Sequence, residues 1–113
     1  GIAYWELQEY EKCREAMEKA LENGVTGTPN IYQTLGDACM ALGEYEEALS
    51  SYWKGMGCDG LTEEQLQAML YNEVMAYEGL KDWDGAKVKM AAYVAKYPED
   101  TDAQKEAEFL ETR

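Results

Sequence analysis

The chain has 113 residues, 46% of them hydrophobic, which is enough for one modest core and too few for two independent ones. Its 23 Asp and Glu residues against 10 Lys and Arg give a formal net charge of -13. This excess of negative charge argues against binding to nucleic acid or to anionic membranes, whose phosphates attract basic residues. No apolar run approaches the roughly 18 residues of a membrane-spanning helix, and no signal-peptide pattern opens the chain.

Cysteine usage favours a reducing compartment. The three cysteines, Cys13, Cys39 and Cys58, are an odd number without CxxC spacing, and the chain has no histidine. A zinc site or a Cys–His nucleophile pair therefore lacks the residues it needs. We expect reduced thiols that act as small buried hydrophobes. This predicts a cytoplasmic protein and leaves an extracytoplasmic location open.

Helical signals run along the whole chain. Residues 1–27 predict two helices, the first over about residues 1–8. In the next stretch Thr28 is a good N-cap, Pro29 fits a first helical turn, and Gly43 ends the helix. The following helix has its apolar residues on one face and stops in "GMGCDG"; these residues are Tyr45, Ala48, Leu49, Tyr52 and Met56.

The second half of the chain predicts three more helices. Thr62 and Gln65 have capping-box spacing and begin a helix that runs to about Gly79. Its partner spans about residues 82–96 and ends before Pro98. Thr101, with Gln104 three residues on, is the expected cap of a last helix over about residues 102–112.

Three segments of the chain repeat one pattern. "LQEYEKC" at 7–13, "LGEYEEA" at 42–48 and "LKDWDGA" at 80–86 each have a leucine, an acid, an aromatic, a second acid and a small residue at matched places. They start 35 and 38 residues apart, close to the period of about 34 of helix-turn-helix repeats. Gly36 and Ala48 would let two antiparallel helices approach closely, while Tyr45 and Tyr52 fill wider gaps.

The chain thereby resembles the tetratricopeptide repeat family. The middle unit carries most of the pattern, namely Tyr32, the Leu35-Gly36 pair, Gly43, Tyr45, Ala48 and Tyr52. The third unit departs from it, with Glu73-Val74 in place of Leu-Gly and Tyr93 in place of an alanine. The resemblance implies an all-α fold, a right-handed α-solenoid of about three helix-turn-helix repeats. As one domain, 1–113, it would comprise a truncated repeat 1–27, repeats 28–62 and 63–100, and a C-terminal capping helix 101–113.

The start of the chain aligns with the second half of a repeat's first helix. Gly1 matches Gly36, Ala3 matches Ala38 and Tyr4 matches Cys39. Because the sequence begins inside a repeat and without Met, we expect an excised or processed piece of a longer protein. A naturally shortened first repeat is the alternative.

The resemblance implies that the first helix of each pair lines a concave groove. Those helices, about residues 1–8, 29–42 and 63–79, contain no Lys or Arg and six acids, which are Glu6, Asp37, Glu63, Glu64, Glu73 and Glu78. An acidic groove would attract a basic or neutral peptide segment of a partner protein. The residues assigned to the groove are Trp5, Asn30, Gln33, Asp37, Met40, Tyr71, Asn72, Met75 and Glu78.

Within this set Trp5, Tyr71 and Met75 are the expected anchors, and Asp37 and Glu78 are the expected charge selectors. Met and aromatic residues at this spacing can instead pack repeat against repeat. The family subgroup that clamps C-terminal carboxylates has Lys, Asn and Lys where this chain has Gln33, Asp37 and Ala68. We therefore expect no binding of acidic tails.

Other functions have less support. The chain has no GxSxG, phosphate-loop or HExxH motif, so we expect no enzyme, no catalytic residues and no cofactor. "CDGLTEE" and "PEDTD" lack the spacing of a calcium loop, so no metal site is expected. Two alternatives remain open. One is homo-oligomerisation through apolar surface around Ile2, Tyr4 and Trp5, and the other is a regulatory arm of a larger multidomain protein.

Overall fold

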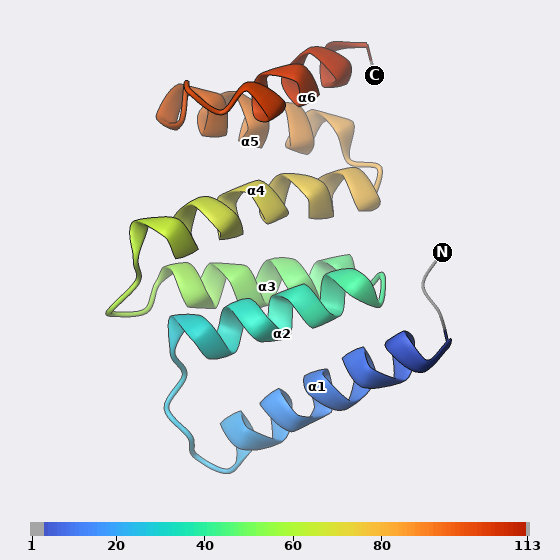
Figure 1. Cartoon of the computed structure of the whole chain (residues 1–113), viewed down its shortest axis with the longest axis vertical. Helices are drawn as coiled ribbons and strands as arrows, with labels where there is room; N and C mark the ends of the chain where they lie inside the picture. Colours follow the sequence, from blue (N-terminus) through green and yellow to red (C-terminus); the bar gives the residue numbers. More distant parts are fainter. Residues whose placement is uncertain (1–3, 113) are drawn as a thin grey trace.

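In a computed structural model, residues 4–112 are described and form six α-helices joined by short turns. Each helix packs against the next one along the chain, so the fold is all-α, as predicted. Figure 1 shows the helices stacked from α1 at one end to α6 at the other. Their bounds are α1 Tyr4–Glu22, α2 Pro29–Ala41, α3 Tyr45–Met56, α4 Glu63–Gly79, α5 Trp83–Lys96 and α6 Thr101–Glu111.

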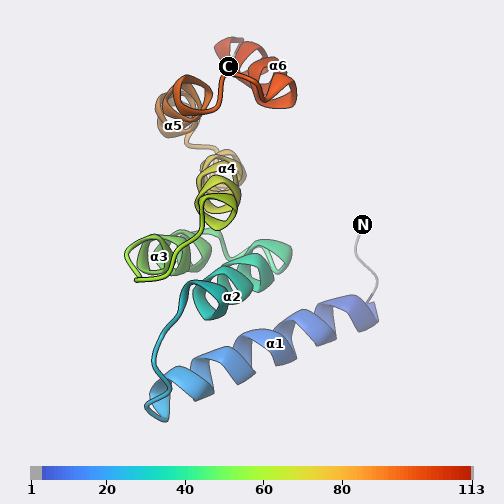
Figure 2. The same cartoon turned by 60° about the vertical axis from the view of Figure 1, so that its left-hand side comes forward.

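The stack has two different sides. Figure 2 shows α2, α4 and α6 along one side and α3 and α5 along the other. The first side is called the groove face below. The contacts α2–α3, α3–α4, α4–α5 and α5–α6 follow the chain order, and α2 also contacts α4 across one helix. The six helices therefore pack in sequential pairs, consistent with about three helix-turn-helix repeats.

The capping residues predicted for α2 and α4 are confirmed. Thr28 Oγ1 accepts a hydrogen bond from Ile31 N at 3.2 Å. Thr62 and Gln65 form the reciprocal capping box, with bonds of 3.0 and 3.1 Å. Each cap satisfies donors that the first helical turn leaves without an intrahelical partner.

The turns after α2 and α4 are alike. Gly43 follows the C-cap Leu42 with a φ of 77°, and Lys81 follows the C-cap Leu80 with a φ of 60°. A lysine in this left-handed region is unfavourable by itself, so the packing that the turn permits must offset the cost. The equivalence predicted for Leu42 and Leu80 is thus confirmed.

The start of the chain differs from the prediction. Residues 4–22 form one continuous helix, and Leu7 lies inside it instead of at a turn. A break after residue 8 was wrong because Gln8, in the place of Gly43, is a good helix former, and no residue of α1 is buried, so packing does not reward a turn. Tyr4 and Trp5 remain 76% and 65% exposed. The expected matches of Gly1 and Ala3, and the expected exposure of Ile2, lie outside the described residues.

The cap of α6 also differs from the prediction. Asp100, not Thr101, is the N-cap, and its Oδ1 accepts from Ala103 N at 3.1 Å. Gln104 does not close a capping box with Thr101, because its side-chain amide donates to the carbonyl of Pro98. Both residue types are good caps, and the fold selects Asp100 because a second bond, from Tyr93, holds it.

In each helix pair the two helices pack together at one matched pair of residues. A Cβ at Gly36 would lie 2.5 Å from the ring of Tyr52, which is fully buried above it. In the next pair Val74 takes the place of Gly36 and Met90 that of Tyr52, and both are buried in one core cluster. The space that Tyr52 fills almost alone in the first pair is thus shared by side chains from both helices in the second. Tyr45 lies between pairs, since a Cβ at Gly79 of α4 would meet its ring at 2.5 Å.

A buried carboxylate stands where the repeat pattern has leucine. Glu73 is 3% exposed, and its Oε2 accepts a hydrogen bond from the indole Nε1 of Trp53. Lys89 Nζ lies 3.8 Å from the same oxygen. A buried charge is tolerated only with such partners, so Glu73 ties α4 to both α3 and α5 on the side opposite the groove face.

Candidate functional site

A fixed carboxylate lies at the centre of the groove face. Asp37 of α2 is exposed, and its Oδ1 accepts from the Tyr52 hydroxyl at 2.5 Å and from Asn72 Nδ2 of α4 at 3.2 Å. Two residues assigned to the groove from the sequence, Asp37 and Asn72, are thus joined across two helices. Because both bonds use one oxygen, the carboxylate is oriented before any partner arrives.

Tyr52 supports this carboxylate from below. Burial raises the pKa of the Tyr52 hydroxyl, and its hydrogen bond to the Asp37 carboxylate raises that pKa further. The hydroxyl therefore stays protonated and donates at every physiological pH. The buried ring that fills the space above Gly36 also positions a charge on the surface.

A hollow of about 530 Å³ lies between the N-terminal ends of α2 and α4. Asn30 Oδ1 accepts from the side-chain amide of Gln65, which connects the two helices at this edge. Gln33, which is half-buried, lines the hollow beside them. The full lining is Asn30, Gln33, Thr62, Glu64 and Gln65.

A second hollow, of about 540 Å³, lies between α4 and the start of α6. It shares Glu64 with the first hollow, so the two are neighbouring parts of one surface. Its full lining is Glu64, Gln67, Ala68, Tyr71, Asn72, Tyr93, Asp100 and Asp102. The sequence assigned only Tyr71 and Asn72 to the groove. The signal that marks this hollow is Tyr93, which departs from the repeat pattern.

The other residues assigned to α2 and α4 are half-buried. Met40 packs against the core cluster of the α2–α3 pair, and Tyr71 and Met75 pack against that of the α4–α5 pair. These three side chains therefore contribute to packing as well as to the surface. Glu78 lies further along α4, and its carboxylate is near enough to raise the pKa of Tyr71, after burial and the charges of Glu106 and Asp100.

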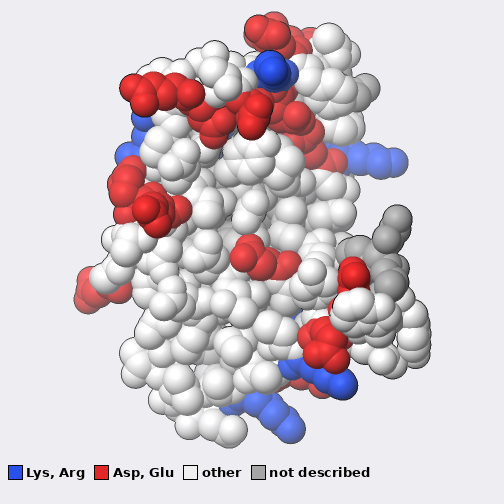
Figure 3. All heavy atoms as spheres, viewed as in Figure 1, with Lys and Arg blue, Asp and Glu red and all other residues white. Residues whose placement is uncertain are grey.

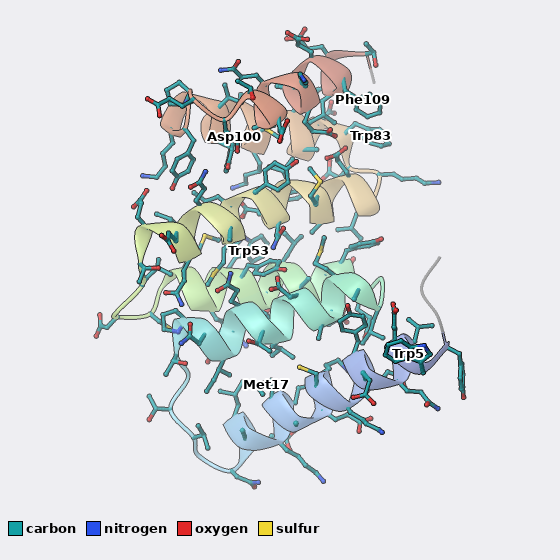
Figure 4. All side chains as sticks on the ribbon, viewed as in Figure 1. Trp5, Met17, Trp53, Trp83, Asp100 and Phe109 are labelled. Carbon is teal, nitrogen blue, oxygen red and sulfur yellow. The ribbon has the colours of Figure 1, made fainter. Side chains whose placement is uncertain are left out.

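Trp5 is not brought together with these residues. It lies on α1, at the N-terminal end of that helix, where Figure 4 shows it well away from α4. The assignment of Trp5 assumed a separate first helix over residues 1–8, and α1 is continuous instead. α1 contacts α2 through half-buried residues such as Met17, which points between the two helices in Figure 4.

Charge is unevenly distributed over the groove face. Figure 3 shows Asp and Glu gathered over α6 and its junction with α4, with a basic side chain among them, and further Lys and Arg at the sides and lower end of the face. Neither hollow has a Lys or Arg in its lining. Ion pairs among the described residues include Lys12–Glu9, Arg14–Glu44, Lys89–Glu73 and Lys96–Glu63, and none of these four uses a carboxylate that lines a hollow.

The comparison with known families bears on the helix pairs. A model of the tetratricopeptide repeat matches residues 1–23 and 29–55, which span α1, α2 and most of α3. The chain contains tetratricopeptide repeats. No curated protein matches it with significance. Beyond the matched residues, α4 and α5 form a further hairpin with the same turn geometry as α2 and α3.

Tetratricopeptide repeats are generally protein–protein interaction modules and are typically non-catalytic, and the matching family is not a catalytic one. Among residues 4–112 no group of three or more Cys, Asp or Glu is arranged to hold a metal ion. None of the helices in the described part of the chain is long and apolar enough to cross a membrane.

Proposed function

We propose that the groove face binds an extended segment of a partner protein, with basic or neutral side chains, and that no bond is made or broken. The observation that carries this proposal is the pair of adjoining hollows, about 530 and 540 Å³, whose linings contain acids and amides and no Lys or Arg. Complementary potential would steer a basic segment to this face and speed its association.

The proposed roles follow from the contacts. Asp37 offers an oriented carboxylate at the centre, since one of its oxygens is held by Tyr52 and Asn72 while the residue itself is exposed. Tyr71 and Met75 are the proposed anchors, because half-buried side chains lose little freedom on binding. Glu78 acts with Asp37 in selecting a basic segment. Gln33 and Met40 add contacts from α2. Trp5 is the proposed anchor at the α1 end of the stack.

A selection from random peptides tests the proposal without knowledge of the partner. Dodecapeptides displayed on phage would be selected against the whole chain in about 0.05 M NaCl and again in about 0.5 M NaCl, where exposed charges are strongly screened. We expect Lys and Arg to be enriched over the input library at low salt and less so at high salt. Enrichment of Asp and Glu would contradict the proposal.

Two variants of equal charge show where binding occurs. The groove variant, Asp37→Asn with Glu64→Gln, removes two negative charges and keeps one acceptor oxygen at residue 37. The control variant, Glu15→Gln with Glu22→Gln, removes two from exposed sites on α1. We expect basic enrichment to disappear in the first and persist in the second. Equal enrichment in both would place binding elsewhere.

Self-association is a second candidate, favoured by the exposed aromatic residues of α1. Tyr4, Trp5 and Tyr10 are 76%, 65% and 38% exposed, and α1 has no buried residue. Apolar surface of this kind commonly marks an interaction site. Light scattering over a concentration series would show a mass that rises toward a dimer, and Trp5→Ser would prevent the rise. A constant monomer mass would remove this candidate.

A further inference from the structure

The hollow between α4 and α6 exists because the two helix pairs differ at one position. Gly55 of α3 lies close to the neighbouring helices, where a Cβ would be 3.0 Å from Tyr32 Cβ and 3.1 Å from Met69 Cε. In α5 the matching residue is Tyr93, which is 3% exposed. The glycine lets α2 and α4 come into contact, whereas among the described residues α4 and α6 are not in backbone contact.

Tyr93 forms the floor of this hollow and is held from both sides. Its hydroxyl accepts from Gln67 Nε2 of α4 at 3.0 Å and donates to Asp100 Oδ2, the cap of α6, at 2.7 Å. The ring of Tyr71 stands edge-on to it, with the ring centroids 5.5 Å apart and the planes at 68°. One aromatic floor and one aromatic wall therefore have fixed positions.

Negative charge surrounds these rings without a cation among the lining residues. Glu64 comes from α4 and Asp102 from the first turn of α6, so carboxylates stand on both sides of the hollow. Asp100 is already bonded to Tyr93 and to the backbone of α6. The pKa of the Tyr71 hydroxyl is raised, first by burial and then by the charges of Glu106, Asp100, Glu78 and Asp102. These carboxylates therefore lie around the partly buried ring of Tyr71.

We propose that this hollow receives an arginine side chain of the bound segment, stacked on Tyr71 and paired with Glu64 and Asp102. A planar guanidinium is more weakly hydrated than an ammonium, stacks on aromatic rings and binds carboxylates through two parallel bonds. This inference rests on the proposed function and names the residue that the groove face selects.

Small probes test the hollow apart from any partner. The whole ¹⁵N-labelled chain would be titrated with Nα-acetyl-arginine amide, its lysine counterpart and the neutral isostere Nα-acetyl-citrulline amide, at constant ionic strength. We expect amide shifts from arginine to concentrate at Ala68, Tyr71, Asn72 and Asp102, with at least about threefold weaker binding of lysine. Citrulline should cause no saturable shift.

Matched variants decide whether the hollow or general charge attracts the probe. Asp102→Asn and Glu108→Gln each remove one charge from α6, and only the first lines the hollow. We expect at least about threefold weaker arginine binding for Asp102→Asn and no change for Glu108→Gln. Equal losses, shifts spread over all acidic surfaces, or equal binding of citrulline would each overturn the proposal.

The outcome separates this inference from the proposed function. If phage selection enriches basic peptides while Nα-acetyl-arginine amide gives no localised shifts, the arginine site is wrong and the groove proposal stands. If arginine binds the hollow while selection gives no basic enrichment, the hollow recognises arginine, but the groove proposal fails and with it the role of that arginine in a bound segment.

Discussion

Gly36 and Tyr52 divide one space between two helices. The ring of Tyr52 lies where a Cβ of residue 36 would be, and it cannot move aside because it is fully buried and its hydroxyl is bonded to Asp37. Glycine in a helix costs about 1 kcal/mol relative to alanine. The packing and the hydrogen bond that it permits must together exceed that cost.

We expect Gly36→Ala to destabilise the protein by about 1–3 kcal/mol, despite the better helix propensity of alanine, because the new methyl overlaps the Tyr52 ring. Gly57→Ala is the matched control. A Cβ there meets only backbone oxygens at 3.6 and 3.7 Å, so we expect a change of no more than about 0.5 kcal/mol. Urea unfolding of both variants measures the difference. Equal stabilities would contradict the packing argument.

A double-mutant cycle tests the exchange seen in the next pair, where Val74 faces Met90. We expect Gly36→Val to cost less free energy in a Tyr52→Met background than in the natural chain, because methionine can vacate the space that the rigid ring fills. The double variant still lacks the bond from Tyr52 to Asp37, so full stability should not return. Strictly additive changes would show that the two positions do not compete for space.

Residues that follow the repeat pattern could be predicted from the sequence, and residues that depart from it could not. Asp37 and Asn72 were assigned to one face by register, and the structure joins them by a hydrogen bond. The hollow beside them depends on Tyr93, whose position in the pattern predicts an alanine and gives no indication of what a large ring would displace. Choosing Asp100 over Thr101 as a cap likewise requires the bond from Tyr93.

At the scale of elements, α1 shows that a turn forms only where the helices on its two sides pack against each other. Lys81 adopts a φ of 60° where the turn lets α4 and α5 close over Val74 and Met90. Gln8 holds the matching place in α1 and stays helical. The repeat pattern therefore places a turn correctly only where packing on both sides offsets its cost.

We expect Gln8→Gly to lower helix content and to cost about 1 kcal/mol relative to Gln8→Ala, because residue 8 lies inside a continuous helix. If residue 8 occupied a turn like that of Gly43, glycine would be neutral or favourable there. Far-UV circular dichroism and urea unfolding of the two variants distinguish these cases. A Gln8→Gly variant as helical as Gln8→Ala would instead support a helix that is interrupted after residue 8.

The attachment of α6 depends on ionised Asp100. The hydrogen bond from Tyr93, and next the one from the Ala103 backbone, lower the pKa of Asp100 below its ordinary value. A carboxyl whose pKa is lowered on folding stabilises the protein above its unfolded pKa, about 3.9, and this contribution is lost as the pH falls through the lower, folded pKa. The α6 junction should therefore weaken in acid.

We expect Asp100→Asn to melt at a lower temperature than the natural chain near neutral pH, and the gap to narrow as the pH falls below about 4. Asparagine is also a good N-cap, so the substitution mainly removes the charge. Asp84→Asn, an exposed change on α5, is the matched control and should show a smaller gap. Thermal melts across the pH series would contradict the argument if the Asp100→Asn gap stayed constant into acid.

At the scale of the whole molecule, the order and pairing of the helices could be predicted because each hairpin carries its own caps and small residues. Thr28, Thr62 and Gly43 act within a few residues of the chain, so they need no knowledge of the stack. The open space between α4 and α6 depends on three helices at once. This space arises because one residue that departs from the repeat pattern, Tyr93, changes how the neighbouring helices pack.

Stability should vary along the stack because each helix contacts mainly its neighbours. α1 has no buried residue and covers one side of α2, and α6 has only Ala103 and Leu110 buried. The inner helices are packed on both sides. Local opening is governed by such differences in buried contact, so α1 should open most readily, followed by α6, and α2 to α5 least.

Native-state hydrogen exchange measured by NMR would test this order, with each amide rate divided by its intrinsic rate in an unfolded chain. We expect protection in α1 to be at least about tenfold lower than in α4. Met17→Ala should lower protection further in α1 and leave α4 nearly unchanged, since among the described helices the backbone of α1 contacts only α2. Ala103→Gly should act in the same local way on α6. Equal protection in all helices, or a loss in α4 as large as that in α1, would mean that the stack opens as one unit, and the gradient inferred from nearest-neighbour packing would be wrong.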